Sequence, residues 1–289
     1  MTISTLAEVI APATVSDLRT VLRERRLSFR RAESMERYSG LIDWPALRGI
    51  VGSGVVHSNQ LRVTRNGVVL HRLMYSDDGK VNAQRLDGLI AQGISIVINK
   101  LEIYAPAVAT LCDDMRAQFQ NEIIDLVSVL TSGPGGAFKL HNDACDGLVM
   151  QIEGAKRWRV YGSPVSYPVI RMPKSLPPET PPIFDEVLRP GDLLVLPSGY
   201  WHHCDNASEI SLHVTCTIQP RVALDVLRDI VGRLADEELF RLPLLRMDTQ
   251  QRAQHETALK SRLVDVIAQT SFCDAAARLS DDVGRNEEK

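Results

Sequence analysis

The sequence predicts a mainly β protein with flanking helices, and three observations support this prediction. Between about residues 124 and 219, short apolar runs such as "DLLVLPS" and "ISLHVTCTI" alternate with turns rich in Gly, Pro, Asp, Asn and Ser. Many short strands with such turns are typical of a sandwich or barrel rather than of β-α-β units. Helical periodicity precedes and follows this stretch. We therefore expect N-terminal helices and accessory strands in 1–123, a β core in 124–220 and a helical region in 221–289.

The first of these regions combines helices with a few strands. Apolar side chains at Leu18, Val21 and Leu22 share one helical face, which resumes at Leu27 and Phe29. This pattern predicts an amphipathic helix from about residue 16 to 32. The elements expected after it are a hairpin turning at Asn66-Gly67, a helix over 82–93, a buried strand over 94–99 and a helix over 105–120.

The last region shows two helical stripes of apolar residues, formed by Leu224, Leu227, Val231 and Leu234 and by Leu259, Leu263, Val266 and Ile267. An isolated helical hairpin has little core of its own, so both stripes need a partner surface. We expect a homodimer through a two-fold interface, with Leu227, Leu234 and Leu263 near the contact. The alternative is that these helices fold back onto their own barrel.

Composition bounds the class of protein. With 44% hydrophobic residues the 289-residue chain can form a sizeable core, and no apolar run approaches the ~18 residues of a membrane helix. The start of the chain lacks the pattern of a secretory signal. Five scattered cysteines without a C-x-x-C pair indicate reduced thiols in the cytoplasm. A net charge of −3 gives no general attraction to nucleic acid.

One basic stretch stands apart from this composition. "RERRLSFRR" at residues 23–31 holds five arginines in nine residues. It is interpreted either as a solvated helix face or as a docking patch for an acidic partner or RNA, and the sequence leaves both open.

The candidate functional residues begin with "FKLHND", read as a strand. Side chains alternate along a strand, so His141 and Asp143 would share one face there. An imidazole and a carboxylate on one face can bind a metal, although such pairs also occur by chance. A third ligand must come from another strand, and "RPGDLLVLPSGYWHHCDN" offers His202 and His203, the first of them 61 residues downstream (202 − 141). Two histidines and a carboxylate are the ligand set of non-haem Fe(II) oxygenases.

These stretches resemble a known family. "TSGPGGAFKLHNDACDGLVMQIEGAKRWRVYGSP" and "RPGDLLVLPSGYWHHCDNASEISLHVT" are similar to the JmjC/cupin-like 2-oxoglutarate oxygenases, and most of all to the ribosomal-protein hydroxylases. The shared pattern is H-x-D, then Q-x-E-G-x-K-x-W, a P-x-G-x-x-H turn and an S-x-H-x-T strand. The resemblance covers roughly residues 40 to 220 and implies a double-stranded β-helix (jelly-roll) with flanking helices.

The resemblance also implies ligands and cofactors. The metal ligands would be His141, Asp143 and His202, because Pro197 to His202 match the family turn; His203 would lie on the other face. The cofactors would be Fe(II), 2-oxoglutarate as cosubstrate and O2.

Further residues are implied as cosubstrate ligands. Lys156 stands where the family has a basic residue for the distal carboxylate of 2-oxoglutarate, although a surface lysine is the alternative and Lys139 is a second candidate. His213 would lie near the metal or the 2-oxo-acid end, or else be a buried histidine bonded to a neighbouring strand. Asn99 resembles a family position without an assigned role.

Two departures from the family limit these implications. Many JmjC relatives have a threonine where this chain has Phe138, so another hydroxyl such as Thr131 would have to bind the cosubstrate. The ribosomal branch also carries a winged-helix domain, for which residues 221–289 leave no room beside the helices. We therefore expect a protein, peptide or amino-acid substrate and hold a ribosomal one to be doubtful.

The expected activity is hydroxylation with release of succinate and CO2. N-methyl demethylation by the same chemistry is an alternative. Two further alternatives remain. One is a cupin that holds Zn or Mn and is not an oxygenase, and the other is a metal-free scaffold protein. Nothing in the sequence identifies the substrate.

Overall fold

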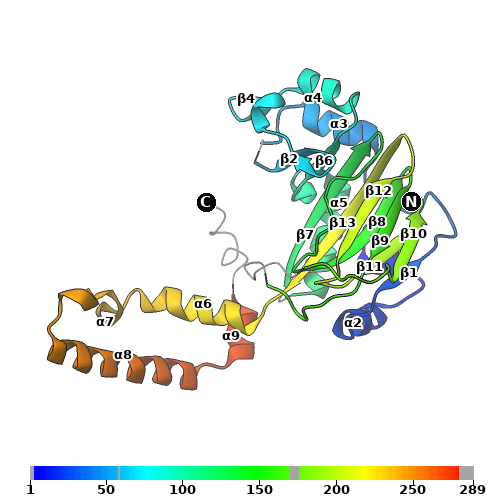
Figure 1. Cartoon of the computed structure of the whole chain (residues 1–289). Coiled ribbons are helices and arrows are strands. Elements are labelled where there is room, and N and C mark those ends of the chain that lie inside the picture. The colour runs from blue at the N-terminus through cyan, green and yellow to red at the C-terminus, as the bar shows by residue number, and fades with distance from the viewer. Residues whose placement is uncertain (1–2, 58, 121, 170–175, 280–289) are drawn as a thin grey trace. The chain divides into compact units, whose positions relative to one another are not determined.

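The structure is a computed structural model of the chain and describes residues 3–57, 59–120, 122–169 and 176–279 (Figure 1). The chain divides into two compact units. The first comprises Met1–Phe119 and Ile124–Gln219, and the second comprises Gln120–Ile123 and Pro220–Lys289.

The first unit is built on an eight-stranded sheet. Its strand order is β1-β11-β8-β13-β7-β6-β2-β3. The strands are β1 (Ser28–Arg30), β2 (Leu61–Arg65), β3 (Val68–Val69), β6 (Ser95–Ile98), β7 (Glu122–Ser132), β8 (Asp146–Glu153), β11 (Leu193–Leu196) and β13 (Ile210–Pro220). Strand β8 is third in this order and pairs antiparallel with β11 and β13. Seven of its eight residues are buried, as expected for a strand covered on both faces.

A smaller sheet completes the barrel. Its order is β10-β9-β12, with β9 (Lys156–Val160), β10 (Phe184–Leu188) and β12 (His202–Asn206); β4 (Ser76–Asp77) and β5 (Lys80–Val81) form a separate hairpin. Apolar side chains from both sheets form one cluster, in which Val149 and Leu194 of the large sheet meet Trp158 and Val160 of the small one. The fold is therefore the expected double-stranded β-helix with flanking helices.

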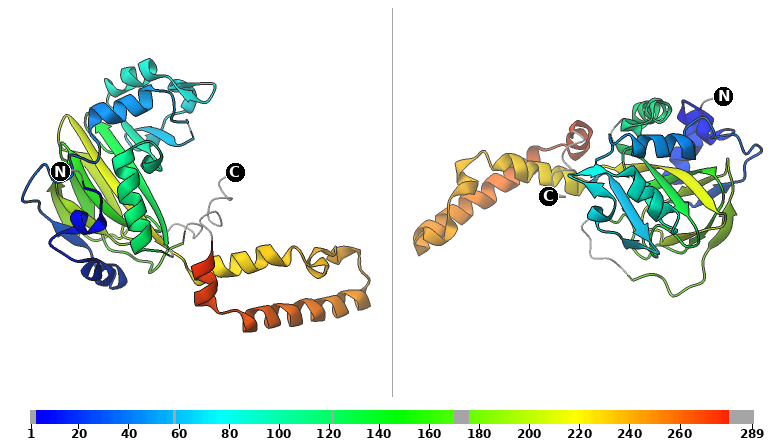
Figure 2. Two further views of the ribbon diagram at one scale, coloured as in Figure 1. Left: turned by 180° about the vertical axis from the view of Figure 1, so that it is seen from behind. Right: turned by 90° about the horizontal axis from the view of Figure 1, so that it is seen from above.

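Helices cover the outer face of the large sheet (Figure 2). They are α1 (Leu6–Ile10), α2 (Val15–Arg23), α3 (Trp44–Gly52), α4 (Ala83–Ile90) and α5 (Pro106–Gln118), with short 3₁₀ turns η1 (Arg72–Met74) and η2 (Leu101–Ile103). Side-chain oxygens cap α1 to α4 at Thr5, Thr14, Asp43 and Asn82. The predicted helices over 82–93 and 105–120, the strand over 94–99 and the Asn66-Gly67 hairpin are all present.

The helix predicted over 16–32 is wrong in its second half. Helix α2 ends at Arg23, and Arg25 has a positive φ of 50°, which a helix cannot continue. The chain then forms β1, in which Phe29 pairs with Leu194 of β11. Leu27 and Phe29 therefore pack on the cluster between the two sheets, where strand pairing outweighs the helical period.

The second unit is helical. It contains α6 (Ala223–Leu234), α7 (Glu238–Arg241), η3 (Leu244–Arg246), α8 (Thr249–Gln269) and α9 (Phe272–Arg278). Val226, Ile230 and Leu234 of α6 pack with Leu263 of α8 and Ala275 of α9 in a small core. Leu224 and Val231, which the sequence placed on the same stripe as Leu234, are exposed. Among the described residues, no helix has the length and apolar character to cross a bilayer.

Candidate metal centre

Two backbone hydrogen bonds join His141 to His202. The amide of His141 donates to the carbonyl of His202 (3.1 Å), and the amide of His202 donates to the carbonyl of His141 (2.7 Å). His202 is the first residue of β12, whereas His141 lies in irregular chain before β8. The strand predicted over "FKLHND" is therefore wrong: a single antiparallel bridge aligns the two histidines in its place.

Both imidazole rings face one carboxylate oxygen. Oδ2 of Asp143 lies 3.8 Å from Nε2 of His141 and 3.6 Å from Nε2 of His202. The candidate ligand atoms of the three residues all lie within 4.8 Å of one another. The structure thus brings together the three residues that the sequence suggested as ligands, at separations that one ion could bridge.

The second ring nitrogens determine which lone pairs are free. Nδ1 of His141 lies 2.8 Å from the carbonyl of Lys139, and Nδ1 of His202 lies 3.0 Å from the carbonyl of Tyr200. A carbonyl only accepts hydrogen bonds, so each Nδ1 carries the proton and each Nε2 presents its lone pair to the cluster. Burial and the neighbouring His141 lower the pKa of His202 to about 4, which keeps this ring neutral at neutral pH. Neutral imidazole is the form that binds metals.

The turn that carries His202 is held from several sides. The amide of Ser198 donates to the buried carboxylate of Asp146 (2.7 Å), and the amide of Gly199 donates to the carbonyl of Asp143 (2.7 Å). Gly199 has φ +81°, and a Cβ there would come within 2.6 Å of Ser163 Oγ. Only glycine fits such a position without strain.

Arg25 ties this turn to the N-terminal segment. Its guanidinium donates to the carbonyl of Ser198 (2.9 Å) and to Ser163 Oγ (3.1 Å), while the hydroxyl of Tyr200 donates to the carbonyl of Arg25 (2.9 Å). Two other arginines of the basic stretch also bond within the chain: Arg30 to the carbonyls of Ile10 and Ala11, and Arg31 to Asp192 and the Val187 carbonyl. These contacts are long-range, so no sequence pattern signals them.

A cavity of about 510 Å³ surrounds the three residues. Its apolar wall includes Val97, Val129 and Val149 from the large sheet and Trp158 from the small one. The Trp158 ring stacks on His202 at a centroid distance of 5.8 Å. Tight aromatic and aliphatic walls restrict water around the polar atoms, which strengthens electrostatic interactions inside.

Lys156 lies behind the cavity wall, against His213 and Val129, which line the cavity. The side chain is fully buried, and Nζ lies 3.0 Å from Nδ1 of His213 and 3.3 Å from the Val129 carbonyl. No carboxylate among the described residues pairs with it, and burial lowers its pKa to about 8. The surface alternative for Lys156 is thereby wrong. His213 is buried beside it and lines the cavity, whereas Lys139 lines the cavity as an exposed side chain.

Thr131 and Phe138 lie differently. The hydroxyl of Thr131 is 3.0 Å from Ser95 Oγ, and Thr131 is not among the described residues that line the cavity. Phe138 lines it, with its ring centroid 5.2 Å from that of His141. A role for Thr131 in binding the cosubstrate therefore remains a prediction that the geometry does not favour.

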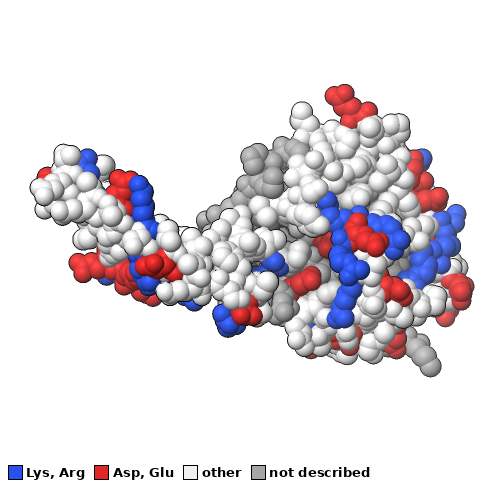
Figure 3. Space-filling view, turned by 90° about the horizontal axis from the view of Figure 1, so that it is seen from below, with Lys and Arg blue, Asp and Glu red and all other residues white. Residues whose placement is uncertain are grey.

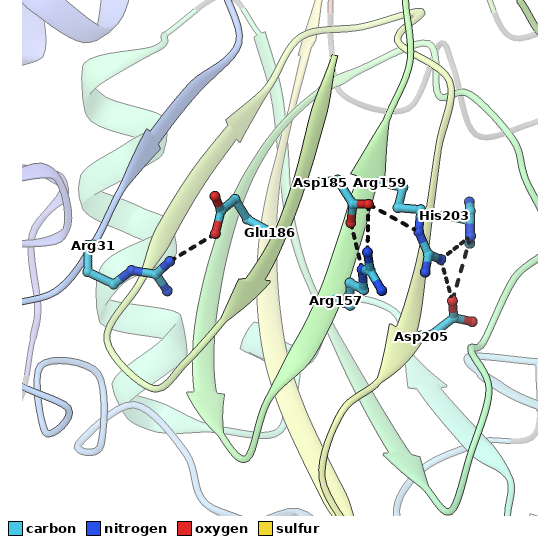
Figure 4. A network of polar contacts seen from close by, with 7 residues as sticks. All are labelled: Arg31, Arg157, Arg159, Asp185, Glu186, His203 and Asp205. Carbon is cyan, nitrogen blue, oxygen red and sulfur yellow. Dashed lines mark hydrogen bonds and ion pairs between the residues drawn. The ribbon is translucent and has the colours of Figure 1, made fainter. Parts of the chain in front are cut away.

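His203 points away from the cluster. Its Nε2 lies 3.0 Å from a guanidinium nitrogen of Arg159 and 3.6 Å from Asp205, within an ion-pair network on the outer side of the small sheet (Figure 4). The network continues through Asp185 to Arg157. The adjacent histidines thus occupy opposite faces of β12, as the period of a strand requires.

Comparison with known proteins agrees with this geometry. A family profile described as "JmjC domain" matches residues 104–226. Residues 104–226 are therefore similar to a JmjC domain. All three candidate ligands and both buried cosubstrate candidates, Lys156 and His213, lie within it.

Part of this chain is also similar to curated proteins. The chain is 32% identical over 152 residues to the "Bifunctional lysine-specific demethylase and histidyl-hydroxylase NO66" of Drosophila willistoni, covering 50% of the chain and 20% of that protein. It is 26% identical over 224 residues to the protein of the same name from Drosophila grimshawi, covering 75% of the chain and 30% of that protein. The chain therefore spans less than a third of the length of these two relatives.

Solved structures share the fold. The X-ray structure of Escherichia coli ycfD aligns with a TM-score of 0.58 at 19% identity, covering 88% of this chain and 68% of that one. A second structure of YcfD, described as a ribosomal oxygenase in complex with cobalt and 2-oxoglutarate, aligns with a TM-score of 0.56 at 18% identity, over 89% and 68% of the two chains. At this identity the likeness concerns the fold.

Proposed function

We propose that the chain is an Fe(II)- and 2-oxoglutarate-dependent oxygenase that hydroxylates a side chain of a protein, peptide or amino-acid substrate. One observation carries the proposal: His141 and His202 direct Nε2 toward Asp143 in a cavity, and a wall residue of that cavity, His213, contacts the buried ammonium of Lys156, which has no carboxylate partner among the described residues. The first part suits a metal with open positions, and the second suits a dicarboxylate ligand.

The donor set fits Fe(II). Two neutral imidazoles and one carboxylate would hold the ion, and the carbonyls of Lys139 and Tyr200 would keep both rings in the required tautomer and orientation. When bound, Fe(II) with 2-oxoglutarate and O2 supplies the oxidising power that converts a C–H bond to C–OH, with 2-oxoglutarate leaving as succinate and CO2.

The remaining residues bind, orient and exclude water. Lys156 would pair with the distal carboxylate of 2-oxoglutarate. This carboxylate would be the counter-charge that the ammonium lacks in the free protein. His213 accepts from this ammonium through Nδ1 and stays neutral, because burial and Lys156 lower its pKa well below the usual value. Trp158, itself buried, stacks on the candidate ligand His202 and would fix the position of its ring.

N-demethylation is the second candidate, because the two fly relatives carry both activities in their names. Hydroxylation of an N-methyl group gives a carbinolamine that loses formaldehyde, so the two outcomes differ in product. An oxygen retained on the substrate indicates hydroxylation, and formaldehyde with a mass loss of one methylene indicates demethylation.

The test is turnover of the cosubstrate. Protein purified without oxygen and supplied with Fe(II), ascorbate and 2-oxoglutarate should form succinate, and candidate peptides and amino acids should gain one oxygen in the mass spectrometer. Retention of Zn or Mn without succinate formation under any of these conditions would instead favour a metal-holding cupin that is not an oxygenase.

Compartment and assembly form part of the same proposal. All five cysteines are free thiols, which supports a reducing compartment such as the cytoplasm. Apolar side chains left exposed on α6 and α8, among them Val231 and Val264, support a homodimer through the helical unit. Acidic side chains lie beside the basic ones on the face shown in Figure 3, which gives no support to nucleic acid as a partner.

A further inference from the structure

Arg62 lies on the inner face of the large sheet. In the register of β2, β6 and β7, Arg62 is opposite Val97, and Val97 is opposite Val129. Residues directly opposite in neighbouring strands place their side chains on the same face. Val97 and Val129 are buried and line the cavity, as does Arg62. Arg62 therefore continues an apolar row on the side that faces the candidate metal centre.

The neighbouring residues of β2 confirm this direction. Val63 is fully buried in the core beneath the helices, and the guanidinium of Arg65 donates to Gln92, just after α4 (2.9 Å). Odd positions of β2 thus face the helices. Because side chains alternate along a strand, Arg62 projects to the opposite side from Arg65.

The guanidinium of Arg62 is one aromatic ring away from a candidate ligand. It lies over the ring of Phe138 at 5.8 Å from the centroid, and the Phe138 ring lies 5.2 Å from that of His141. Lys139 follows Phe138 and also lines the cavity. Its side chain packs on the β2–β3 turn, so closely that a Cβ added at Gly67 would lie 2.7 Å from Cγ of Lys139. The same hairpin thereby positions two cations.

Neither cation is neutralised within the described part of the chain. No carboxylate there pairs with Arg62 or Lys139, and Asp143 is the one acidic residue among the described residues that line the cavity. Other arginines of this unit do pair: Arg48 with Asp87 and Arg157 with Asp185. An arginine directed at a cavity without a counter-charge is suited to bind an anion from outside.

Two kinds of cation without a carboxylate partner among the described residues thus lie at different depths, Arg62 and Lys139 in the cavity wall and Lys156 behind it. Lys156 is fully buried beside His213, whereas Arg62 and Lys139 are exposed at the solvent side of the cavity. One 2-oxoglutarate bound to Lys156 and the metal would neutralise the buried ammonium. Arg62 and Lys139 would still lack an anionic partner.

We propose that Arg62, assisted by Lys139, binds a carboxylate of the substrate and so selects an acidic substrate. This inference rests on the proposed oxygenase function for the meaning of "substrate". The carboxylate belongs either to an Asp or Glu side chain of a peptide or to a free amino acid. The planar guanidinium can hold it through two parallel hydrogen bonds in its own plane, while the Phe138 ring lies against one face of the guanidinium.

The experiment measures charge preference without turnover. Protein loaded with Mn(II) and 2-oxoglutarate in the absence of O2 is titrated with three hexapeptide pools that differ only in a central Glu, Gln or Lys, and separately with free glutamate and glutamine. The bound fraction is read from paramagnetic broadening of the ligand's NMR signals. We expect the wild type to bind the Glu pool about tenfold more tightly than the Gln pool, as for one charge-assisted contact. The free amino acids decide whether a peptide is needed.

Variants test the assignment to Arg62. In Arg62→Gln the ratio of the affinities for the Glu pool and the Gln pool should fall to about one. Arg62→Glu should bind the Lys pool most tightly, and Arg62→Lys should keep part of the preference for the Glu pool. Arg65→Gln is the matched control, since it alters the same residue type three positions along β2 on the other face, and it should leave the preference unchanged. Equal binding of the three pools by the wild type, or an unchanged preference in Arg62→Gln, would overturn the inference.

Failure of this inference can be told apart from failure of the oxygenase proposal. Succinate formation and 2-oxoglutarate affinity are measured on the same preparations. If Arg62→Gln weakens 2-oxoglutarate and not the Glu pool, Arg62 serves the cosubstrate and the inference is wrong. If the Glu preference depends on Arg62 but no succinate forms, the anion site stands and the oxygenase proposal falls.

Discussion

Nζ of Lys156 lies 3.0 Å from Nδ1 of His213, and both side chains are buried away from any described carboxylate. A buried ammonium bonded only to neutral acceptors loses hydration without gaining a counter-charge, so burial lowers its pKa from 10.5 to about 8. An anion bound beside Lys156 would supply the missing counter-charge, and the charge of Lys156 in the free protein depends on pH within an accessible range.

The affinity for 2-oxoglutarate should fall as pH rises through about 8. Below this pH, Lys156 is charged in the free protein and attracts the distal carboxylate; above it the free protein loses the proton, which must be regained on binding. The dissociation constant should rise about tenfold between pH 7 and pH 9. Equilibrium binding with Mn(II) under nitrogen measures this, and Lys156→Met should bind weakly with no such pH dependence. A wild-type affinity that stays constant up to pH 9 would contradict the assignment.

Lys156→Ala should chiefly raise KM for 2-oxoglutarate. The substitution removes a contact made in the ground state as well as during reaction, so kcat should change less than KM. Steady-state succinate formation checks this, with Lys139→Ala as the comparison. An unchanged KM in Lys156→Ala together with a raised KM in Lys139→Ala would move the cosubstrate role to Lys139.

His141→Ala and Asp143→Ala should each abolish metal retention and succinate formation while leaving the fold intact. Side chains at both positions are partly exposed at the cavity, with 28% and 51% of their surface accessible, so little core packing is lost. Metal analysis and thermal unfolding of the same samples separate the two effects.

His203→Ala is the matched control for His202→Ala, because the two residues are adjacent and point to opposite faces of β12. Its loss affects Arg159 and Asp205, not the cluster, so activity should remain within a few-fold of wild type. A larger loss of activity in His203→Ala than in His202→Ala would show that His203 is the ligand.

Arg25→Ala should weaken metal binding although Arg25 does not touch the three candidate ligands. Its loss leaves the Ser198 carbonyl without this donor and frees the turn before His202. We expect a loss of about 1–3 kcal/mol in the free energy of unfolding, as for a partly buried charged hydrogen bond, and a lower affinity for Mn(II). Arg26→Ala, at an exposed side chain with only a 3.9 Å contact to Glu24, should change both by little. Equal effects of the two variants would remove the positioning role of Arg25.

The parts of this site that local patterns encode were predictable from the sequence. Asn66-Gly67 determines a tight hairpin through its own backbone preferences, and the alternation of His202 and His203 follows from strand geometry. Arg25 and Ser198 are separated by 173 positions, so their contact exists only once the sheets have closed. Arg62 could not be predicted for the same reason: its strand has the pattern of a short accessory hairpin, and only the register with β6 places Arg62 at the cavity.

The helical unit leaves apolar surface exposed on both of its long helices. Val231 of α6 and Val264 of α8 are each 64% exposed, whereas Leu234 and Leu263 pack inside the unit. Contacts between two copies would therefore use Val231 and Val264 rather than Leu234 and Leu263. We predict a homodimer, so light scattering should give twice the chain mass of 32.1 kDa.

Charge placed on this surface should dissociate the dimer. Val231→Glu combined with Val264→Glu should give a folded monomer, because burying two carboxylates in an apolar contact costs more than such a contact contributes. Leu234→Glu is the contrasting variant: it places a charge in the core of the unit and should unfold α6 and α9, which circular dichroism detects as lost helix. A wild-type protein that stays a monomer at micromolar concentration would refute the homodimer and leave the metal centre unaffected.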